Sequence, residues 1–274
     1  MKQLADEREA AQASAYRDFW KEVGSSFPDL SGAASTRYYF ANERRLFEEH
    51  LPELKGLRVF KTDLWDEAKN THILHWAHRQ GALTAGVDIS PPTVWQAVKA
   101  YGPDRLIAAV ADVRQIPFKD ESFDAIYSMG TIEHFLDPET ALREMHRILR
   151  PGGTAIVGVP NLHDPFLRPL MVAVMGRLGL YSYGYGYEKA FSRRALDRML
   201  REAGFEVVAH SGILFMPGWL RILDLACHTW CRPLSRLTGA AVWPFAFLDR
   251  HIRALRRHGY LIVSVGVKRA APAS

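Results

Sequence analysis

Apolar and polar positions follow two different spacings through the middle of the chain. Short apolar runs are predicted to form strands at 57–60, 82–88, 106–110, 123–128 and 154–159. Between them apolar residues recur at helical spacing, which predicts helices over 71–80, 92–100 and 137–149. The last of these helices is expected to stop at Pro151-Gly152-Gly153, which has the chemistry of a turn. Strands that alternate with helices in this way are typical of βαβ units around a parallel sheet.

The pattern changes on both sides of this alternation. Mixed apolar and charged residues at helical spacing predict helices over 3–23 and 33–52, and therefore an N-terminal helical cap over 1–55. Further along, Ser192 is expected to cap a helix that ends near 203, with strands at 205–210 and 259–267. Because the last strand has to return to the same sheet, we expect one α/β domain over 56–274. It has acceptor-side segments at 162–190 and 211–257, and the second of them is expected to be a C-terminal helical insertion.

Composition narrows the class of protein. The 274 residues are 48% hydrophobic and 24% charged, as in ordinary folded soluble proteins, and the formal net charge is +5. Cys227 and Cys231 are too few for a disulfide framework or a zinc ribbon. The start of the chain shows no apolar signal segment and no apolar run reaches about 18 residues, so a cytoplasmic protein is expected.

Polar residues follow the predicted strands at the positions where parallel sheets bind ligands. Asp88 ends the second strand, Asp112 follows the third, and Met129 and Gly130 follow the fourth. A carboxylate at the end of the second strand suits a pair of ribose hydroxyls, although Asp88 could also serve as a helix cap. For Asp112 a turn, and for Met129 and Gly130 plain packing, stay open as alternative interpretations.

A series of short motifs runs through this region in a fixed order. They are Pro117-Phe118, Ser122-Phe123-Asp124, Glu133-His134-Phe135 and Arg147-Ile148-Leu149-Arg150-Pro151-Gly152-Gly153. Over residues 57–160 the series resembles class I S-adenosylmethionine-dependent methyltransferases, in particular the type 11 group. The resemblance implies a Rossmann-like seven-stranded, mostly parallel sheet with helices on both faces, and S-adenosylmethionine as cofactor. It places the cofactor near Lys61, Thr62, Asp63, Asp88, Ile89, Asp112, Val113, Met129 and Gly130.

The loop after the first strand departs from the pattern of that family. Lys61 stands where an acidic residue is usual, and Asp63, Trp65 and Glu67 stand where glycines are usual. In one interpretation the loop is rebuilt, with Asp63 or Glu67 pairing the ammonium of the cofactor and Lys61 its carboxylate. In the other, cofactor binding is lost and the chain is a non-catalytic scaffold or partner subunit. The missing glycines also argue against a nicotinamide enzyme.

Several side chains are candidates for the chemistry of methyl transfer. His134 is the first candidate for a general base, with Glu133 and His163 as further acid–base candidates. Tyr185, Tyr187 and Trp219 are expected to contact the acceptor, with 162–190 and 211–257 as the acceptor-side segments. His72, His75 and His78 are spread too widely around a helix for an easy metal site, so no metal is expected.

The segment 211–257 combines aromatic residues with arginines. This composition fits a peripheral membrane surface, a homodimer interface or a plain helical cap, and the sequence leaves these alternatives open. We expect a small or lipid-like acceptor, methylated at oxygen by the habit of the family. No nucleic-acid partner is expected, because the chain has no basic stripe and Ser128-Met129-Gly130-Thr131 lacks the tetrad of amino-methylating enzymes.

Overall fold

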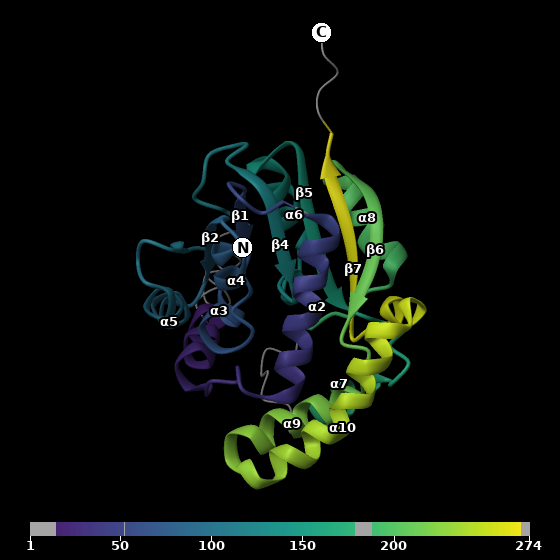
Figure 1. Cartoon of the computed structure of the whole chain (residues 1–274). Helices are drawn as coiled ribbons and strands as arrows, with labels where there is room; N and C mark the ends of the chain where they lie inside the picture. Colours follow the sequence, from purple (N-terminus) through teal and green to yellow (C-terminus); the bar gives the residue numbers. More distant parts are fainter. Residues whose placement is uncertain (1–14, 52, 179–187, 270–274) are drawn as a thin grey trace, which may run out of the picture.

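The computed structural model describes residues 15–51, 53–178 and 188–269. They form a seven-stranded sheet in the order β3-β2-β1-β4-β5-β7-β6 (Figure 1). Its strands are β1 (Arg58–Lys61), β2 (Leu83–Asp88), β3 (Ile107–Val110), β4 (Phe123–Met129), β5 (Leu149–Pro160), β6 (Phe205–Ile213) and β7 (Leu261–Lys268). Strands β1 to β5 pair in parallel, and β7 lies antiparallel between β5 and β6. The prediction of a Rossmann-like, mostly parallel sheet is confirmed.

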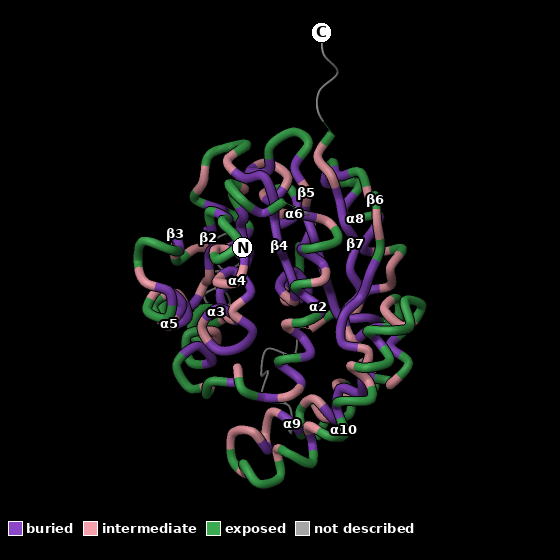
Figure 2. The backbone as a smooth tube through the Cα atoms, in the orientation of Figure 1, coloured by how far each residue is buried: buried purple, intermediate pink, exposed green. Residues whose placement is uncertain are grey.

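Helices cover both faces of this sheet. Their bounds are 15–26, α2 (Ala34–His50), α3 (Trp65–Lys69), α4 (Ile73–Arg79), α5 (Pro91–Tyr101), η1 (Ile132–His134), α6 (Pro138–Ile148), α7 (Arg168–Arg177), α8 (Arg193–Glu202), α9 (Gly218–Trp230), α10 (Arg232–His251) and η2 (Arg253–His258). One apolar core joins the sheet to α2, α4, α5 and parts of α9 and α10. A second core joins the opposite face to α6 and α8. Figure 2 shows the buried strands between these two layers.

Helix α2 fixes α9 and α10 to the rest of the molecule. Asp224 of α9 accepts hydrogen bonds from Ser35 N at 2.7 Å and from Thr238 Oγ1 at 2.8 Å. Asp249 of α10 accepts from Asn42 Nδ2 at 2.8 Å and pairs with Arg45 at 3.0 Å. Both carboxylates are buried, and these contacts tie the two helices to α2 below the sheet (Figure 1).

Three local features differ from the sequence prediction. Strand β5 begins at Leu149, so the Pro-Gly-Gly turn lies within it, with Gly152 at φ +77°. The short helix α3 was not predicted, because its residues occupy a position where a loop was expected. Helix α7 lies in a segment that was predicted without regular structure, since its apolar residues show no one-sided pattern. Among the described residues no helix is long and apolar enough to span a bilayer.

Candidate functional site

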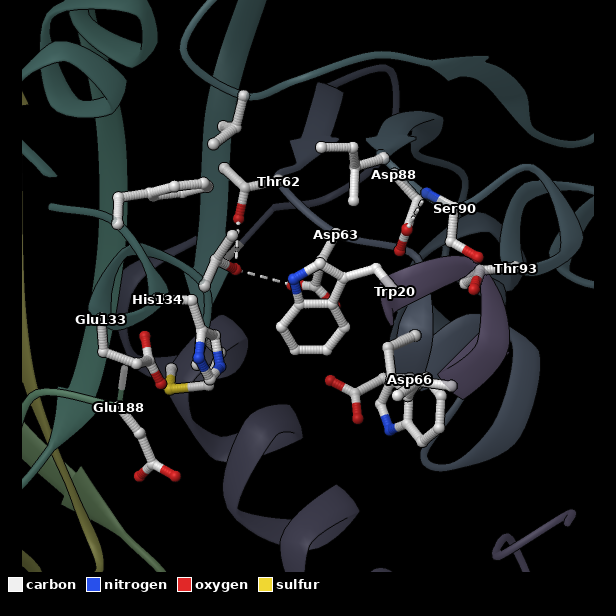
Figure 3. A pocket seen from close by; sticks show the side chains of 18 of the residues that line it. Trp20, Thr62, Asp63, Asp66, Asp88, Ser90, Thr93, Glu133, His134 and Glu188 are labelled. Carbon is white, nitrogen blue, oxygen red and sulfur yellow. Dashed lines mark hydrogen bonds between the residues drawn. The ribbon is translucent and has the colours of Figure 1, made fainter. Parts of the chain in front are cut away.

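The carboxyl ends of β1 to β5 open into one pocket of about 210 Å³ (Figure 3). Its floor comes from the residues that follow each strand. Its roof comes from the helix 15–26, which places Tyr16 and Trp20 over the opening. The ring of Trp20 meets the ring of His134 edge to face, with 5.0 Å between their centroids. The pocket therefore lies at the edge of the sheet where α/β proteins bind ligands.

Asp88, the last residue of β2, is held by backbone groups. Its Oδ2 accepts from Leu64 N at 3.0 Å, and its Oδ1 accepts from Ser90 N at 2.8 Å. Burial, with a smaller contribution from the nearby charge of Asp63, raises the pKa of this carboxyl to about 7, although the two backbone hydrogen bonds act to lower it. Each oxygen retains acceptor capacity toward the pocket, as two adjacent hydroxyl groups of a ligand require.

The loop after β1 is built around a buried ammonium group. Lys61 is fully buried, and its Nζ donates to Asp63 O and Asp63 Oδ1 at 3.1 Å and to Asp66 Oδ2 at 3.2 Å. Burial acts to lower the pKa of Lys61, but the surrounding carboxylates outweigh it and raise the pKa above its usual range. Because the ammonium has three hydrogens and all three are donated, Lys61 has none to offer a ligand.

This arrangement corrects part of the sequence prediction for the loop. Lys61 lies behind the pocket wall, so it cannot pair the carboxylate of a cofactor. Glu67 also lies behind the wall, where it accepts from Tyr101 OH and from Leu74 N. Asp63 and Asp66 line the pocket instead. The loop packs closely on β2 because Gly86 has no side chain: a Cβ there would lie 2.6 Å from Leu64 Cδ2.

Asp112 and its neighbours form the wall beyond β3. The Asp112 carboxylate pairs with Arg114, with Nη2 and Oδ2 2.6 Å apart. Burial acts to raise the pKa of Asp112, but the hydrogen bonds from Arg114 outweigh it and lower the pKa. Val113 and Phe135 add apolar surface beside it. A carboxylate next to an apolar slot is suited to a flat ring that carries an amino group.

Glu133 and His134 line the opposite end of the pocket. Glu133 is buried, and its Oε2 has no hydrogen-bond partner among the described residues. Burial raises the pKa of Glu133 well above its usual range, and the nearby carboxylate of Glu188 adds to the effect. Glu188 itself is paired with Arg168. An unsatisfied buried carboxyl that faces a pocket is a group prepared for a ligand or a proton.

Two arginines and two tyrosines complete this end of the pocket. Arg168 lies over the ring of Tyr260 at 4.2 Å from its centroid. Arg221 lies over the rings of Tyr39 and Tyr260 at 5.0 and 5.5 Å. The wall is therefore aromatic with a cationic edge.

The structure brings most of the sequence-predicted site residues together. Those that line the pocket are Thr62, Asp63, Asp88, Ile89, Asp112, Val113, Met129, Gly130, Glu133 and His134. His163 is exposed and lies outside the pocket. Its backbone N donates a hydrogen bond to Asn161 Oδ1, in a turn that follows β5. Trp219 is 57% exposed on the outer side of α9, away from the pocket. Tyr185 and Tyr187 lie outside the described residues. The described residues contain no cluster of three or more side chains that could hold a metal ion.

Several pocket residues could not be predicted from the sequence pattern. They are Tyr16, Trp20, Tyr39, Asp66, Arg168, Glu188, Arg221 and Tyr260. All but one come from segments outside the strand–helix alternation, so no strand end marked them. An aromatic face on the helix 15–26 was the one usable signal.

The chain is similar to one family model and to several known methyltransferases. Residues 55–157 match the family model described as "Methyltransferase domain". The chain is 32% identical over 142 residues to a demethylmenaquinone methyltransferase of Roseiflexus castenholzii, covering 47% of this chain and 60% of that protein. It is 30% identical over 138 residues to the 27-O-demethylrifamycin SV methyltransferase of Amycolatopsis mediterranei, covering 48% and 49%. The match thus spans about half to 60% of these relatives.

Solved structures share the fold. The [4+2]-cyclase SpnF superposes with a TM-score of 0.56 at 18% identity, over 85% of this chain and 82% of the cyclase. The 1,6-didemethyltoxoflavin-N1-methyltransferase of Burkholderia thailandensis superposes with a TM-score of 0.53 at 16% identity, over 98% and 90%. At these identities the likeness shows the fold alone, and one fold carries many reactions.

Proposed function

Residues 55–157 form a domain of the methyltransferase family with the class I fold, and on this premise we propose that the chain transfers a methyl group from S-adenosylmethionine to a small, lipid-like acceptor, at an oxygen atom. The observation that carries the proposal is Asp88, a carboxyl at the end of β2 that faces the pocket with acceptor capacity on both oxygens. The curated relatives named above are methyltransferases of small molecules.

The charges that line the pocket fit this cofactor. Six carboxyl groups face the cavity, against the cations of Arg168 and Arg221: Asp63, Asp66, Asp88, Asp112, Glu133 and Glu188. S-Adenosylmethionine carries a sulfonium and an ammonium, and an acidic pocket favours both.

The residues divide between the parts of the cofactor. Asp88 would hold the ribose hydroxyls and Asp112 the amino group of adenine, with Ile89 and Val113 against the ring. Asp63 and Asp66 would face the ammonium. When bound, S-adenosylmethionine supplies an electrophilic methyl group. Lys61 holds the two loop carboxylates in place, and so replaces by side-chain contacts the order that a glycine-rich turn gives by backbone.

The acceptor is proposed to lie between His134, Glu133 and the aromatic wall of Tyr39 and Tyr260. A ring nitrogen of His134 can take the proton of an acceptor hydroxyl, and Trp20 fixes the plane of the imidazole. The helix 15–26 covers the pocket, with Trp20 beside His134 and Tyr16 beside Phe135. An aromatic wall of this kind suits an apolar, cyclic or lipid-like acceptor.

Formation of S-adenosylhomocysteine tests the reaction with a panel of apolar phenols and quinols. Binding of S-adenosylhomocysteine together with turnover on an acceptor supports the proposal. The rival is a scaffold that has lost its cofactor, which the altered loop after β1 suggests. A protein that neither binds the cofactor product nor turns over any acceptor belongs to this second class.

Substitution of His134 tests the proposed base. We expect His134→Gln to lower kcat by about 100-fold, with little change in cofactor affinity, because it removes proton transfer while it keeps the volume. His163→Gln is the matched control, since His163 is exposed outside the pocket. Equal losses of kcat in the two variants would show that His134 is not the general base.

The pH dependence of cofactor binding tests Asp88. Because its pKa is about 7, the carboxyl loses its charge as the pH falls through neutrality. We expect cofactor affinity to be about tenfold lower at pH 6 than on its plateau above pH 8, and Asp88→Asn to abolish this dependence. A flat profile in the unsubstituted protein contradicts the assignment.

The same shift acts on stability with the opposite sign. The folded pKa of Asp88 lies above the unfolded value of 3.8. Its contribution to the free energy of unfolding is therefore fully present below pH 3.8 and is lost as the pH rises through about 7. Affinity and stability should change in opposite directions across this window.

A further inference from the structure

Helices α7, α9 and α10 lie below the sheet (Figure 1) and carry many exposed large apolar side chains. We call this surface the outer face and define it by Leu170, Leu223, Trp219, Trp230, Leu237 and Trp243. Trp230 is 81% exposed, Leu237 68% and Trp243 63%. Apolar side chains so exposed, clustered on adjacent helices, mark an interaction surface rather than scattered surface residues.

The exposed charges that α7, α9 and α10 themselves carry have one sign. Helices α9 and α10, which are fully described, contain two acidic residues, and both are buried against α2: Asp224 is 0% exposed and Asp249 is 1% exposed. Helix α7 contains no acidic residue. The exposed charges on α10 are Arg232, Arg236 and Arg250, and the exposed Arg253 and Arg257 follow it in η2. The face therefore offers apolar contact and positive charge together.

We propose that the outer face binds the surface of a lipid bilayer that contains anionic phospholipid. Amphipathic helices with Trp and Leu on one side and Arg at the edge lie in the headgroup region of membranes. Anionic lipid headgroups complement the arginines, and no described helix of the chain can span the bilayer. The proposal concerns attachment and goes beyond the proposed methyl transfer.

Charge favours a bilayer over a second copy of the chain. In a symmetric dimer the same patch meets itself, so the arginines of one outer face would meet those of the other. The inward position of Asp224 and Asp249 leaves these helices with no exposed acid to compensate. Like charges at such an interface oppose association.

The outer face and the pocket are two sides of the same helices. Arg168 begins α7 and Arg221 lies in α9, and both line the pocket. The two helices approach closely at this point, because a Cβ on Gly218 would lie 3.3 Å from Met171 Cε. A bilayer against the outer face would therefore lie next to the acceptor end of the pocket, where a lipid-like molecule could enter.

Vesicle sedimentation of the full chain, without cofactor, tests the proposal. We expect binding to vesicles of phosphatidylglycerol and phosphatidylcholine, weak binding to phosphatidylcholine alone, and a loss of binding at high salt. Removal of two charges in Arg236→Gln/Arg253→Gln should lower the partition coefficient by about 30-fold. Trp230→Ser/Leu237→Ser should also lower it and should remove the blue shift of tryptophan fluorescence on the vesicles.

A matched control uses exposed residues elsewhere. Arg79→Gln/Trp95→Ser removes a charge and a tryptophan that is 62% exposed, on α4 and α5, which lie apart from α9 and α10 (Figure 1). Thermal melting shows that each variant is folded. No binding of the unsubstituted protein to anionic vesicles overturns the proposal, as does an equal loss in the control. A stable dimer in sedimentation that Leu237→Ser converts to a monomer would assign the face to a second copy instead.

Discussion

Replacing Lys61 by Met should lower the free energy of unfolding by about 3–5 kcal/mol. The substitution leaves Asp63 and Asp66 without the ammonium that both contact, in a place where the Lys61 side chain is fully buried. The loop carboxylates would then be uncompensated and poorly solvated. Lys61 is therefore expected to be among the most sensitive polar residues of the domain.

Urea denaturation at neutral pH measures this loss. The triple variant Lys61→Met/Asp63→Asn/Asp66→Asn should recover a large part of the lost stability, because it removes the uncompensated charges together with their partner. A loss below about 1 kcal/mol for Lys61→Met alone would contradict this expectation. It would show that the ion pairs of Lys61 with Asp63 and Asp66 are as weak as solvent-screened surface pairs.

Replacing Asp88 by Ala should weaken the binding of S-adenosylhomocysteine by about 1000-fold. A carboxylate that accepts from two hydroxyls makes two charge-assisted hydrogen bonds, each worth about 2 kcal/mol when lost in a desolvated pocket. The substitution also frees Leu64 N, which Asp88 Oδ2 holds at 3.0 Å, so the loop after β1 loses a fixed point. Both effects act on the same part of the pocket.

Titration calorimetry compares this variant with a control. Asp104→Ala removes an exposed acid that precedes β3 and should leave affinity unchanged. Full affinity in a folded Asp88→Ala variant would show that the carboxylate serves the turn to α5 and not a ligand.

Much of the fold could be predicted from local pattern. The strands from β1 to β5 alternate with helices, and the apolar periodicity of each is a property of its own segment. The helix α8 could be predicted from Ser192, whose side chain does accept from Ala195 N. Helix α3 could not be predicted, because its five residues are too few for a periodic pattern and are stabilised by Lys61 and Asn70 from within the buried network.

The residues of the candidate site show the same difference between local pattern and tertiary packing. Residues such as Asp88, Asp112 and Glu133 follow strands, and the topology of a parallel sheet brings strand ends to one edge. Trp20 and Arg221 reach that edge from distant segments, and tertiary packing alone places them there. The burial of Lys61 could not be predicted either, because its three acceptors come together only when the loop after β1 is folded.

Methyl transfer by this chain requires that the rebuilt loop after β1 still binds the cofactor. Calorimetric titration of the unsubstituted chain with S-adenosylmethionine tests this directly. We predict a saturable heat of binding. The affinity should fall as the pH drops below 7, because Asp88 has a pKa of about 7 and loses its charge there. The absence of any heat at about 1 mM cofactor would contradict the account and leave the domain as a scaffold.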